Sequence, residues 1–359
     1  MNLYFGVTIA PYAVDFCNAL HERFHCRIFH RKEDVAGLAF DPLEVERDCR
    51  FPFERYDSGP GWAAFRRLWQ LVREERPEVV FTSEFSLTTL RLWAIRRLSR
   101  VPFRLVSICD DSLDMIKGND FSRRHRLARH FVPRLTDELI LANPAARKWY
   151  QDHFGKGLLM PIISDEKRLR RAFEAALPRS SELTSQFNPE RKALVLFVGR
   201  LIPLKNLDFL LEAAVGLSVK LVFVGDGPEE KSLRRKAEQE GLDVFFAGRK
   251  SGEDLYAWYN LADVLVLPSH QEAFGAVAGE ALTAGCPVIV SSHAGSAFLV
   301  REGENGSVVS PTDLPGWKEA LSRWAIGHEC GKARHSLFPL SFEQCINDLI
   351  NQLTCKSSQ

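Results

Sequence analysis

Residues 264–292 read VLVLPSHQEAFGAVAGEALTAGCPVIVSS, and this stretch decides the fold. It begins with a short apolar run, passes through a polar segment and a run of small residues, and ends in a second apolar run. Short apolar runs of this kind are typical of strands buried in a parallel sheet, and the segment between them is long enough for one helix. The stretch therefore predicts a strand–helix–strand unit of an α/β protein.

Two glutamates, Glu272 and Glu280, bracket the start of the expected helix. Its small residues keep the helix slim, so a ligand can approach the unpaired backbone N–H groups of the first turn. Those N–H groups and the positive end of the helix dipole attract an anion, and a diphosphate fits this description. Glu280 lies within the helix, where its carboxylate can accept hydrogen bonds from ribose hydroxyls. Glu272 precedes the helix, where a sugar attached to the diphosphate would lie.

In three further segments, an apolar run is followed by a glycine and a turn. They read LVLFVGRLIPLKN at 194–206, LVFVGDGP at 221–228 and VFFAGR at 244–249. Together with Glu272 and Glu280, they resemble the E-x7-E signature and neighbouring strands of retaining GT-B glycosyltransferases of the family 4 type. The resemblance is strong over residues 190–310 and loose in the amino half.

The resemblance implies that the carboxyl half binds a nucleotide-sugar, with UDP or GDP as the nucleotide, and that the reaction retains the configuration of the transferred sugar. The implied donor-binding residues are Gly199, Arg200, Lys205, Gly225, Arg249, Glu272, Ala273, Phe274, Gly275 and Glu280. No D-x-D motif follows a strand, so we expect no metal ion and no other cofactor, with Arg200 and Lys205 neutralising the departing diphosphate. Arg200, Lys205 and Glu272 are therefore catalytic candidates. The alternative is that Arg200 and Lys205 are loop residues whose charges face solvent.

The amino half departs from the wider family. In place of a Gly-Gly loop, residues 10–16 read APYAVDF, which is similar to the opening of bacterial capsule, exopolysaccharide and O-antigen glycosyltransferases. Where many relatives place a histidine after a strand, this chain has Cys109-Asp110-Asp111. Asp110 is the candidate to orient or deprotonate the acceptor hydroxyl, although an Asp after a strand is often a helix cap or turn residue. The other acceptor-side candidates are Tyr12, Asp15, Glu84 and Asp111.

The 359 residues suffice for two domains. We expect a GT-B fold of two Rossmann-like domains: an acceptor-binding domain at 1–170, onto which a terminal helix within 340–359 packs back, and a nucleotide-sugar domain at 171–339. Polar residues at 164–190 predict the connection between them. The apolar runs and amphipathic periods predict strands at 3–10, 26–30, 78–81, 103–108, 138–141 and 158–163, and helices at 16–24, 62–75, 87–98, 124–135, 144–154, 314–325 and 341–353.

Charge is divided unevenly along the chain. The overall net charge is +1, which argues against a nucleic-acid partner. Residues 1–180 hold 30 Lys and Arg against 24 Asp and Glu, whereas the remainder holds 17 against 22. Segments 62–73, 91–100 and 123–131 place Arg beside Trp, Phe and Leu, which suits either peripheral contact with anionic lipid headgroups or core-packed helices with a solvated Arg face.

Eight cysteines without a C-x-x-C pair predict a reduced, metal-free chain, and neither a signal peptide nor an 18-residue apolar span is evident. We therefore expect a cytoplasmic protein, at the inner face of the plasma membrane if it contacts lipid.

The expected function is transfer of a sugar to a saccharide or lipid-linked saccharide in bacterial surface polysaccharide synthesis. The alternatives are a catalytically silent GT-B subunit that binds a partner or glycan, and a nucleotide-sugar epimerase.

Overall fold

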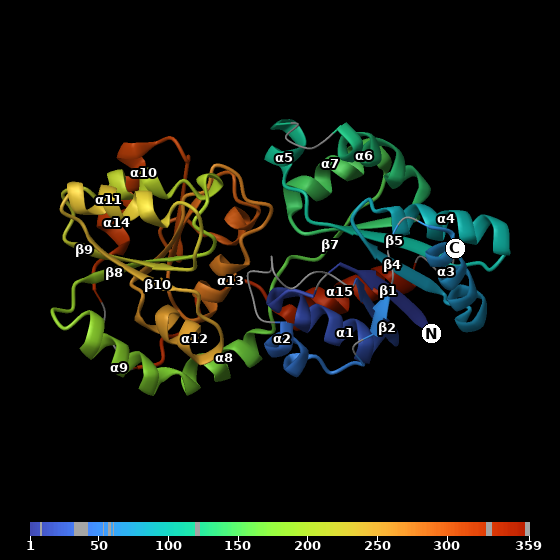
Figure 1. Cartoon of the computed structure of the whole chain (residues 1–359), viewed down its shortest axis with the longest axis horizontal. Helices are drawn as coiled ribbons and strands as arrows, with labels where there is room; N and C mark the ends of the chain where they lie inside the picture. Colours follow the sequence, from blue (N-terminus) through green and yellow to red (C-terminus); the bar gives the residue numbers. More distant parts are fainter. Residues whose placement is uncertain are drawn as a thin grey trace. The chain divides into compact units, whose positions relative to one another are not determined.

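The computed structural model describes residues 1–7, 9–31, 42–52, 54–56, 59, 61–118, 123–327 and 332–355. The chain forms two compact units, one made of Met1–Ser164 with Phe342–Gln359 and the other of Asp165–Ser341. Each unit is built on a parallel sheet flanked by helices, which confirms the expected α/β class with two Rossmann-like domains (Figure 1). No helix in the described part of the chain is long and apolar enough to cross a membrane.

The first unit has a seven-stranded sheet in the order β3-β2-β1-β4-β5-β6-β7. Its strands are β1 Asn2–Gly6, β2 Cys26–Arg31, β3 Glu54–Tyr56, β4 Val79–Ser83, β5 Arg104–Cys109, β6 Glu138–Leu141 and β7 Leu158–Leu159. Its helices are α1 Val14–Phe24, α2 Pro42–Asp48, α3 Trp62–Glu75, α4 Leu87–Ser99, α5 Leu113–Gly118, α6 Arg123–Leu135, α7 Pro144–Phe154 and α15 Phe342–Cys355. Strand order reverses between β1 and β4, so the loops after these strands diverge and leave room at their carboxyl ends.

The second unit has a six-stranded sheet in the order β10-β9-β8-β11-β12-β13. Its strands are β8 Ala193–Val198, β9 Val219–Val224, β10 Asp243–Gly248, β11 Val264–Leu267, β12 Val288–Ser291 and β13 Gly306–Val309. Its helices are α8 Glu166–Ala175, α9 Leu177–Phe187, α10 Leu207–Ala214, α11 Glu230–Gln239, α12 Gly252–Leu261, α13 Ala276–Thr283 and α14 Leu314–Trp324. The order reverses between β8 and β11, the two strands that precede the predicted cations and the E-x7-E segment.

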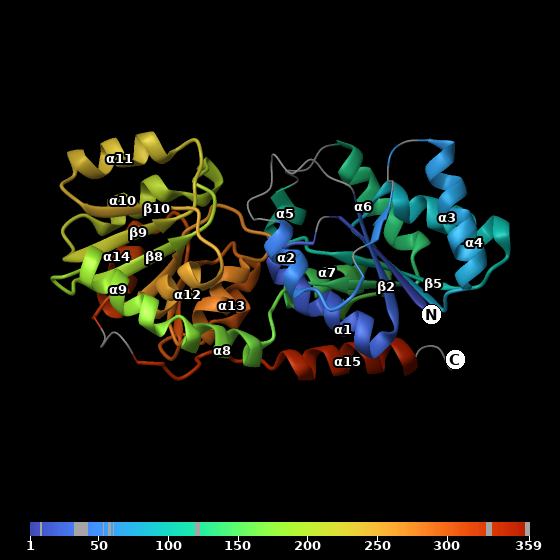
Figure 2. The same cartoon turned by 60° about the horizontal axis from the view of Figure 1, so that its bottom comes forward.

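Helix α15 returns from the second unit's last segment to the first unit. It packs beside α1, and Figure 2 shows these two helices together along one side of that unit. The side chains that α15 buries are Phe342, Ile346, Leu349 and Leu353. Their spacing of three to four residues gives the helix one continuous apolar stripe, which is the reason it is a stable part of the unit.

Three expectations about the elements are wrong. Residues 164–190 are not a turn-rich connection: they form α8 and α9 of the second unit, because Asp165 caps the N–H groups of the first turn of α8 and the polar residues form the exposed faces of amphipathic helices. The first strand ends at Gly6 and not at residue 10, since Pro11–Ala13 begin a 3-10 turn. β7 ends at Leu159, ahead of Pro161, which has no N–H to donate to a neighbouring strand.

Candidate active site

Three glycine turns stack at the carboxyl ends of β8, β9 and β10. The N–H of Gly199 donates to the carbonyl of Val224 at 2.9 Å, and the N–H of Gly225 donates to the carbonyl of Gly248 at 2.9 Å. A Cβ on Gly225 would lie 1.9 Å from the carbonyl oxygen of Gly199, so no other residue fits there. The turns therefore bring backbone rather than side chains to this edge of the sheet, where a ligand can approach closely.

The loop between β11 and α13 is held by main-chain contacts. Glu272 forms an isolated bridge with Ala294, and the N–H of Gly295 donates to the carbonyl of Glu272 at 3.1 Å. Gly275 precedes α13 with a φ of 87°, a left-handed conformation that glycine adopts without strain. The first turn of α13 is thereby presented at the switch point of the sheet, and its N–H groups are suited to an anion.

Lys205 and Glu272 come together at this switch point. Lys205 follows β8 and Glu272 follows β11, the neighbouring strands between which the order reverses. Their side chains form an ion pair and are only 14% and 15% exposed. The Ser269 hydroxyl also donates to the Glu272 carboxylate at 3.4 Å. This pairing was not evident from the sequence, because it joins loops that follow two strands separated along the chain.

The other predicted cations are placed differently. Arg200 is exposed, and no ion pair to it is found among the described residues. Arg249 forms an ion pair with Asp226 at 2.6 Å, and both side chains remain about half exposed. Ala273 lies in the loop, whereas the Phe274 side chain is buried against Phe298 and anchors the loop.

Glu280 is held by a residue that sequence reasoning missed. The Tyr259 hydroxyl, on the buried face of α12, donates to the Glu280 carboxylate at 2.6 Å. Burial raises the pKa of Glu280, and the hydrogen bond from Tyr259 and the charge of Arg168 oppose that increase. The Tyr259 hydroxyl therefore fixes one oxygen of the Glu280 carboxylate and, with it, the direction in which the second oxygen points.

Ser296 also belongs to this region and was not predicted. Its hydroxyl is buried without a hydrogen-bond partner, and it lies 3.1 Å from the position that a Cβ on Gly275 would occupy. The backbone N–H of Ser296 donates to the carbonyl of Phe274 at 2.7 Å, which fixes it beside the start of α13. A serine after a strand and turn is too common in sequences to signal such a placement.

In the first unit, Glu84 occupies a tightly bound turn after β4. Its φ is 55°, an uncommon conformation for a residue with a side chain. Its N–H donates to the carbonyl of Ile108 at 2.6 Å, and its carbonyl accepts from the Ser107 hydroxyl at 2.7 Å. The surrounding protein displaces water from the carboxyl and, with smaller contributions from Asp110 and Asp111, raises the pKa of Glu84 to about 7.

The remaining acceptor-side candidates separate into two groups. Asp111 is buried, and its carboxylate accepts hydrogen bonds from Arg129 Nε and the Tyr150 hydroxyl, both at 2.8 Å. Asp15 is also buried, in the first turn of α1. Asp110 is half-buried after β5, and Tyr12 is exposed. Asp111 is therefore engaged in holding α6 and α7, whereas Asp110 and Glu84 share the carboxyl ends of adjacent strands.

Within the described ranges, no group of three or more His, Cys, Asp or Glu side chains is placed to hold a metal ion.

Two Rossmann-like units, each with its switch-point loops, define the GT-B class of fold, as expected. Solved structures agree: HepE from Anabaena in complex with UDP aligns with a TM-score of 0.75 at 17% identity, covering 99% of this chain and 100% of that one. Sucrose-phosphate synthase from Thermosynechococcus elongatus aligns with a TM-score of 0.70 at 22% identity, covering 99% of this chain and 100% of that one.

Sequence comparison names the family of the second unit. Residues 179–335 match the model of glycosyl transferases group 1, and this part of the chain is therefore a domain of that family. A D-inositol 3-phosphate glycosyltransferase from Mycobacterium sp. (strain KMS) is 37% identical over 139 residues, which is 36% of this chain and 32% of the relative. The aligned part thus spans about a third of the curated relative.

Proposed function

We propose that the protein is a retaining glycosyltransferase that moves a sugar from a UDP- or GDP-sugar to a saccharide or lipid-linked saccharide in bacterial surface polysaccharide synthesis. The observation that carries the proposal is the arrangement around α13, where Lys205 pairs with Glu272 beside the N-terminus of the helix and Glu280 is held by Tyr259. The group 1 domain and the UDP-bound structural neighbour support the donor class.

Each part of this arrangement has a chemical role in the proposal. The first turn of α13 and Lys205 bind the diphosphate and stabilise the negative charge that grows on it as the sugar–phosphate bond breaks. Arg200, whose side chain is exposed, adds a second cation. Glu280 accepts hydrogen bonds from the ribose, and Glu272 accepts them from the sugar. These fixed charges make a metal ion unnecessary, and metal independence is part of the proposal.

The first unit binds the acceptor. As the acceptor oxygen bonds to the sugar carbon, its proton passes to Asp110 or to the departing phosphate, so the charge balances without a cofactor. Glu84 lies after the neighbouring strand and helps to hold the acceptor hydroxyl. A lipid-linked acceptor would place the reaction in the cytoplasm at the inner face of the plasma membrane.

The proposal is tested by incubating the protein with a panel of UDP- and GDP-sugars in the presence of EDTA. We expect slow release of UDP or GDP from one donor, and a loss of about a hundredfold or more in Lys205→Ala, because a charge that meets the transition state is removed. Lys231→Ala, on the exposed face of α11, is the matched control. Interconversion of the sugar without nucleotide release would indicate an epimerase, and the absence of any reaction alongside nucleotide binding would indicate a silent subunit.

A further inference from the structure

Helices α3, α4 and α6 lie side by side on one face of the first unit. α4 contacts both of the others, and Figure 2 shows α3 and α6 on the side opposite to α1 and α15. Each of the three helices turns a buried stripe towards the core, such as Leu68 and Val72 on α3 and Leu92 and Ile95 on α4. We call the outward side of these three helices the basic face.

The basic face exposes large apolar side chains, although the same three helices already bury other apolar side chains in the core. Trp62 is 65% exposed on α3, Leu98 is 65% exposed on α4 and Phe131 is 61% exposed on α6. Leu90 and Leu127 are exposed on the same helices. Large exposed apolar groups rimmed by polar residues are a feature of surfaces that bind a protein or a membrane.

Arginines surround these apolar side chains. α4 and α6 contain no Asp or Glu. Exposed arginines on these helices or directly after them include Arg66, Arg67, Arg97, Arg100 and Arg123, and within the described residues no ion pair to them is found, although α3 also exposes Glu74. By contrast, α15, on the opposite side of the unit, exposes Glu343 and Asp348. The positive charge is therefore concentrated on the face that also carries the exposed apolar groups.

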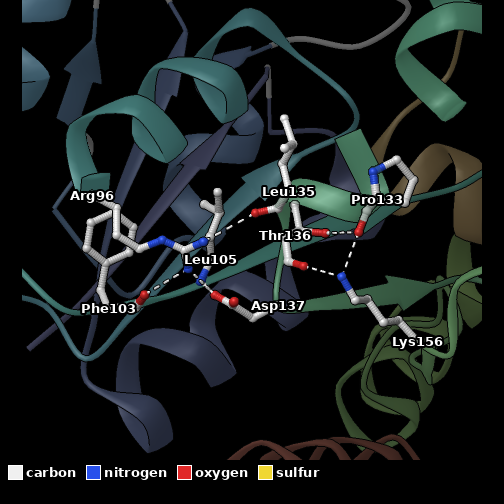
Figure 3. Close-up of polar contacts among 8 residues, drawn as sticks. All are labelled: Arg96, Phe103, Leu105, Pro133, Leu135, Thr136, Asp137 and Lys156. Atoms are coloured by element: carbon white, nitrogen blue, oxygen red, sulfur yellow. Dashed lines mark hydrogen bonds and ion pairs between the residues drawn. The ribbon is translucent and has the colours of Figure 1, made fainter. Parts of the chain in front are cut away.

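Two further cations hold the helices of this face together. Arg96 of α4 donates to the carbonyls of Phe103 at 3.1 Å and Leu135 at 3.3 Å and pairs with Asp137 (Figure 3). Lys156 donates to the carbonyl oxygens of Pro133, at 2.8 Å, and Thr136, at the end of α6. These contacts satisfy the last carbonyls of α6 and fix its end against α4. The basic face is thus preformed. Arg66 lies over the Trp62 ring, 6.0 Å from its centroid, so a cation and an apolar group are already side by side there.

We propose that the basic face docks on an anionic lipid bilayer. Its outer arginines contact lipid phosphates, while Trp62, Leu98 and Phe131 enter the boundary between headgroups and acyl chains. A bilayer is the partner that complements cations and apolar groups interspersed over three adjacent helices. The inference goes beyond the proposed function and stands without it, because none of these residues belongs to the candidate active site.

The test is co-sedimentation of the full chain with phosphatidylcholine vesicles, with and without phosphatidylglycerol. Binding should require phosphatidylglycerol and weaken with salt. Arg66→Gln with Arg97→Gln should weaken it about 25-fold, since each arginine near an anionic surface contributes roughly fivefold. The matched control is Lys231→Gln with Arg235→Gln, two exposed cations of α11, which should bind as the unmodified protein does.

The apolar groups need a separate test. Leu98→Ser with Phe131→Ser should weaken vesicle binding, and the remaining binding should keep the same salt dependence. The control is Ile326→Ser, at a residue 78% exposed in the second unit, which should not weaken vesicle binding. Quenching of tryptophan fluorescence by brominated lipid should be smaller in Trp62→Phe. Equal binding to uncharged vesicles, or equal loss in the control variants, would overturn the proposal. So would displacement by polyglutamate with no effect of the apolar substitutions, which would indicate an acidic macromolecule.

Discussion

Tyr259 and Glu280 show how one buried hydroxyl orients the carboxylate that we propose binds the donor ribose. The hydroxyl donates to the carboxylate at 2.6 Å and opposes the effect of burial on its pKa. Tyr259→Phe should raise the pKa of Glu280 further and leave its carboxylate unoriented, and we expect UDP and GDP affinity to fall about ten- to a hundredfold, which is what the loss of a hydrogen bond to a charged group costs. The control is calorimetry with inorganic pyrophosphate, which lacks ribose, and the affinity for pyrophosphate should not change. Equal losses for both ligands would assign Tyr259 a purely structural role.

Glu84 provides a pH-dependent prediction. Because its pKa is raised to about 7, the folded state disfavours the charged carboxylate relative to the unfolded state. The stability that its neutral form contributes is present below about pH 4.5 and is lost as the pH rises to about 7. Carboxyl carbon NMR should therefore show one glutamate with a midpoint near 7 that is missing in Glu84→Gln. Urea unfolding at pH 5 and pH 7.5 should differ less in that variant, by under about 1 kcal/mol, because protein shields one side of the carboxyl while the residue as a whole is exposed and solvent screens its charge. A midpoint near 4.5 would contradict the prediction.

At the scale of elements, the carboxyl ends of adjacent strands gather the candidate residues. In parallel sheets the loops after adjacent strands meet at one edge, and they diverge where the strand order reverses. Lys205 and Glu272 follow β8 and β11, where the order reverses, and their side chains pair across the space between the two loops. Glu84 and Asp110 lie at the carboxyl ends of the adjacent strands β4 and β5. The glycines at 199 and 225 permit close stacking of the turns, because the carbonyl of one occupies the space where a side chain of the other would lie.

At the scale of the whole molecule, α15 makes the first unit discontinuous in sequence. Leu349 is fully buried in that unit, so Leu349→Ala should cost about 2–5 kcal/mol of its stability. Hydrogen exchange followed by mass spectrometry should show faster exchange throughout the first unit, while the second unit and its nucleotide affinity stay unchanged. The control is Asn351→Ala, at an exposed position of the same helix. Equal effects of the two variants would show that the burial of α15 does not stabilise the unit.

The sequence alone determined the local features of this protein. Short apolar runs predicted the strands. Glu272, Glu280 and the small residues between and around them predicted the loop and helix that the structure contains. These features were predictable because strand and helix periods depend on residues that are neighbours in the chain. Glycines at strand ends were equally informative, since backbone approach and positive φ restrict the residue type at a single position.

Only the tertiary structure decided which side chains meet. The partners Tyr259 for Glu280, Lys205 for Glu272 and Arg129 for Asp111 come from other helices or loops, and no local pattern marks them. The same limit explains the error at residues 164–190, where polar side chains indicated a linker but a few buried apolar residues pack both helices against the second unit. Hydrophobic periodicity fixes which face of an element is buried, whereas the contacts across that face depend on how distant elements pack.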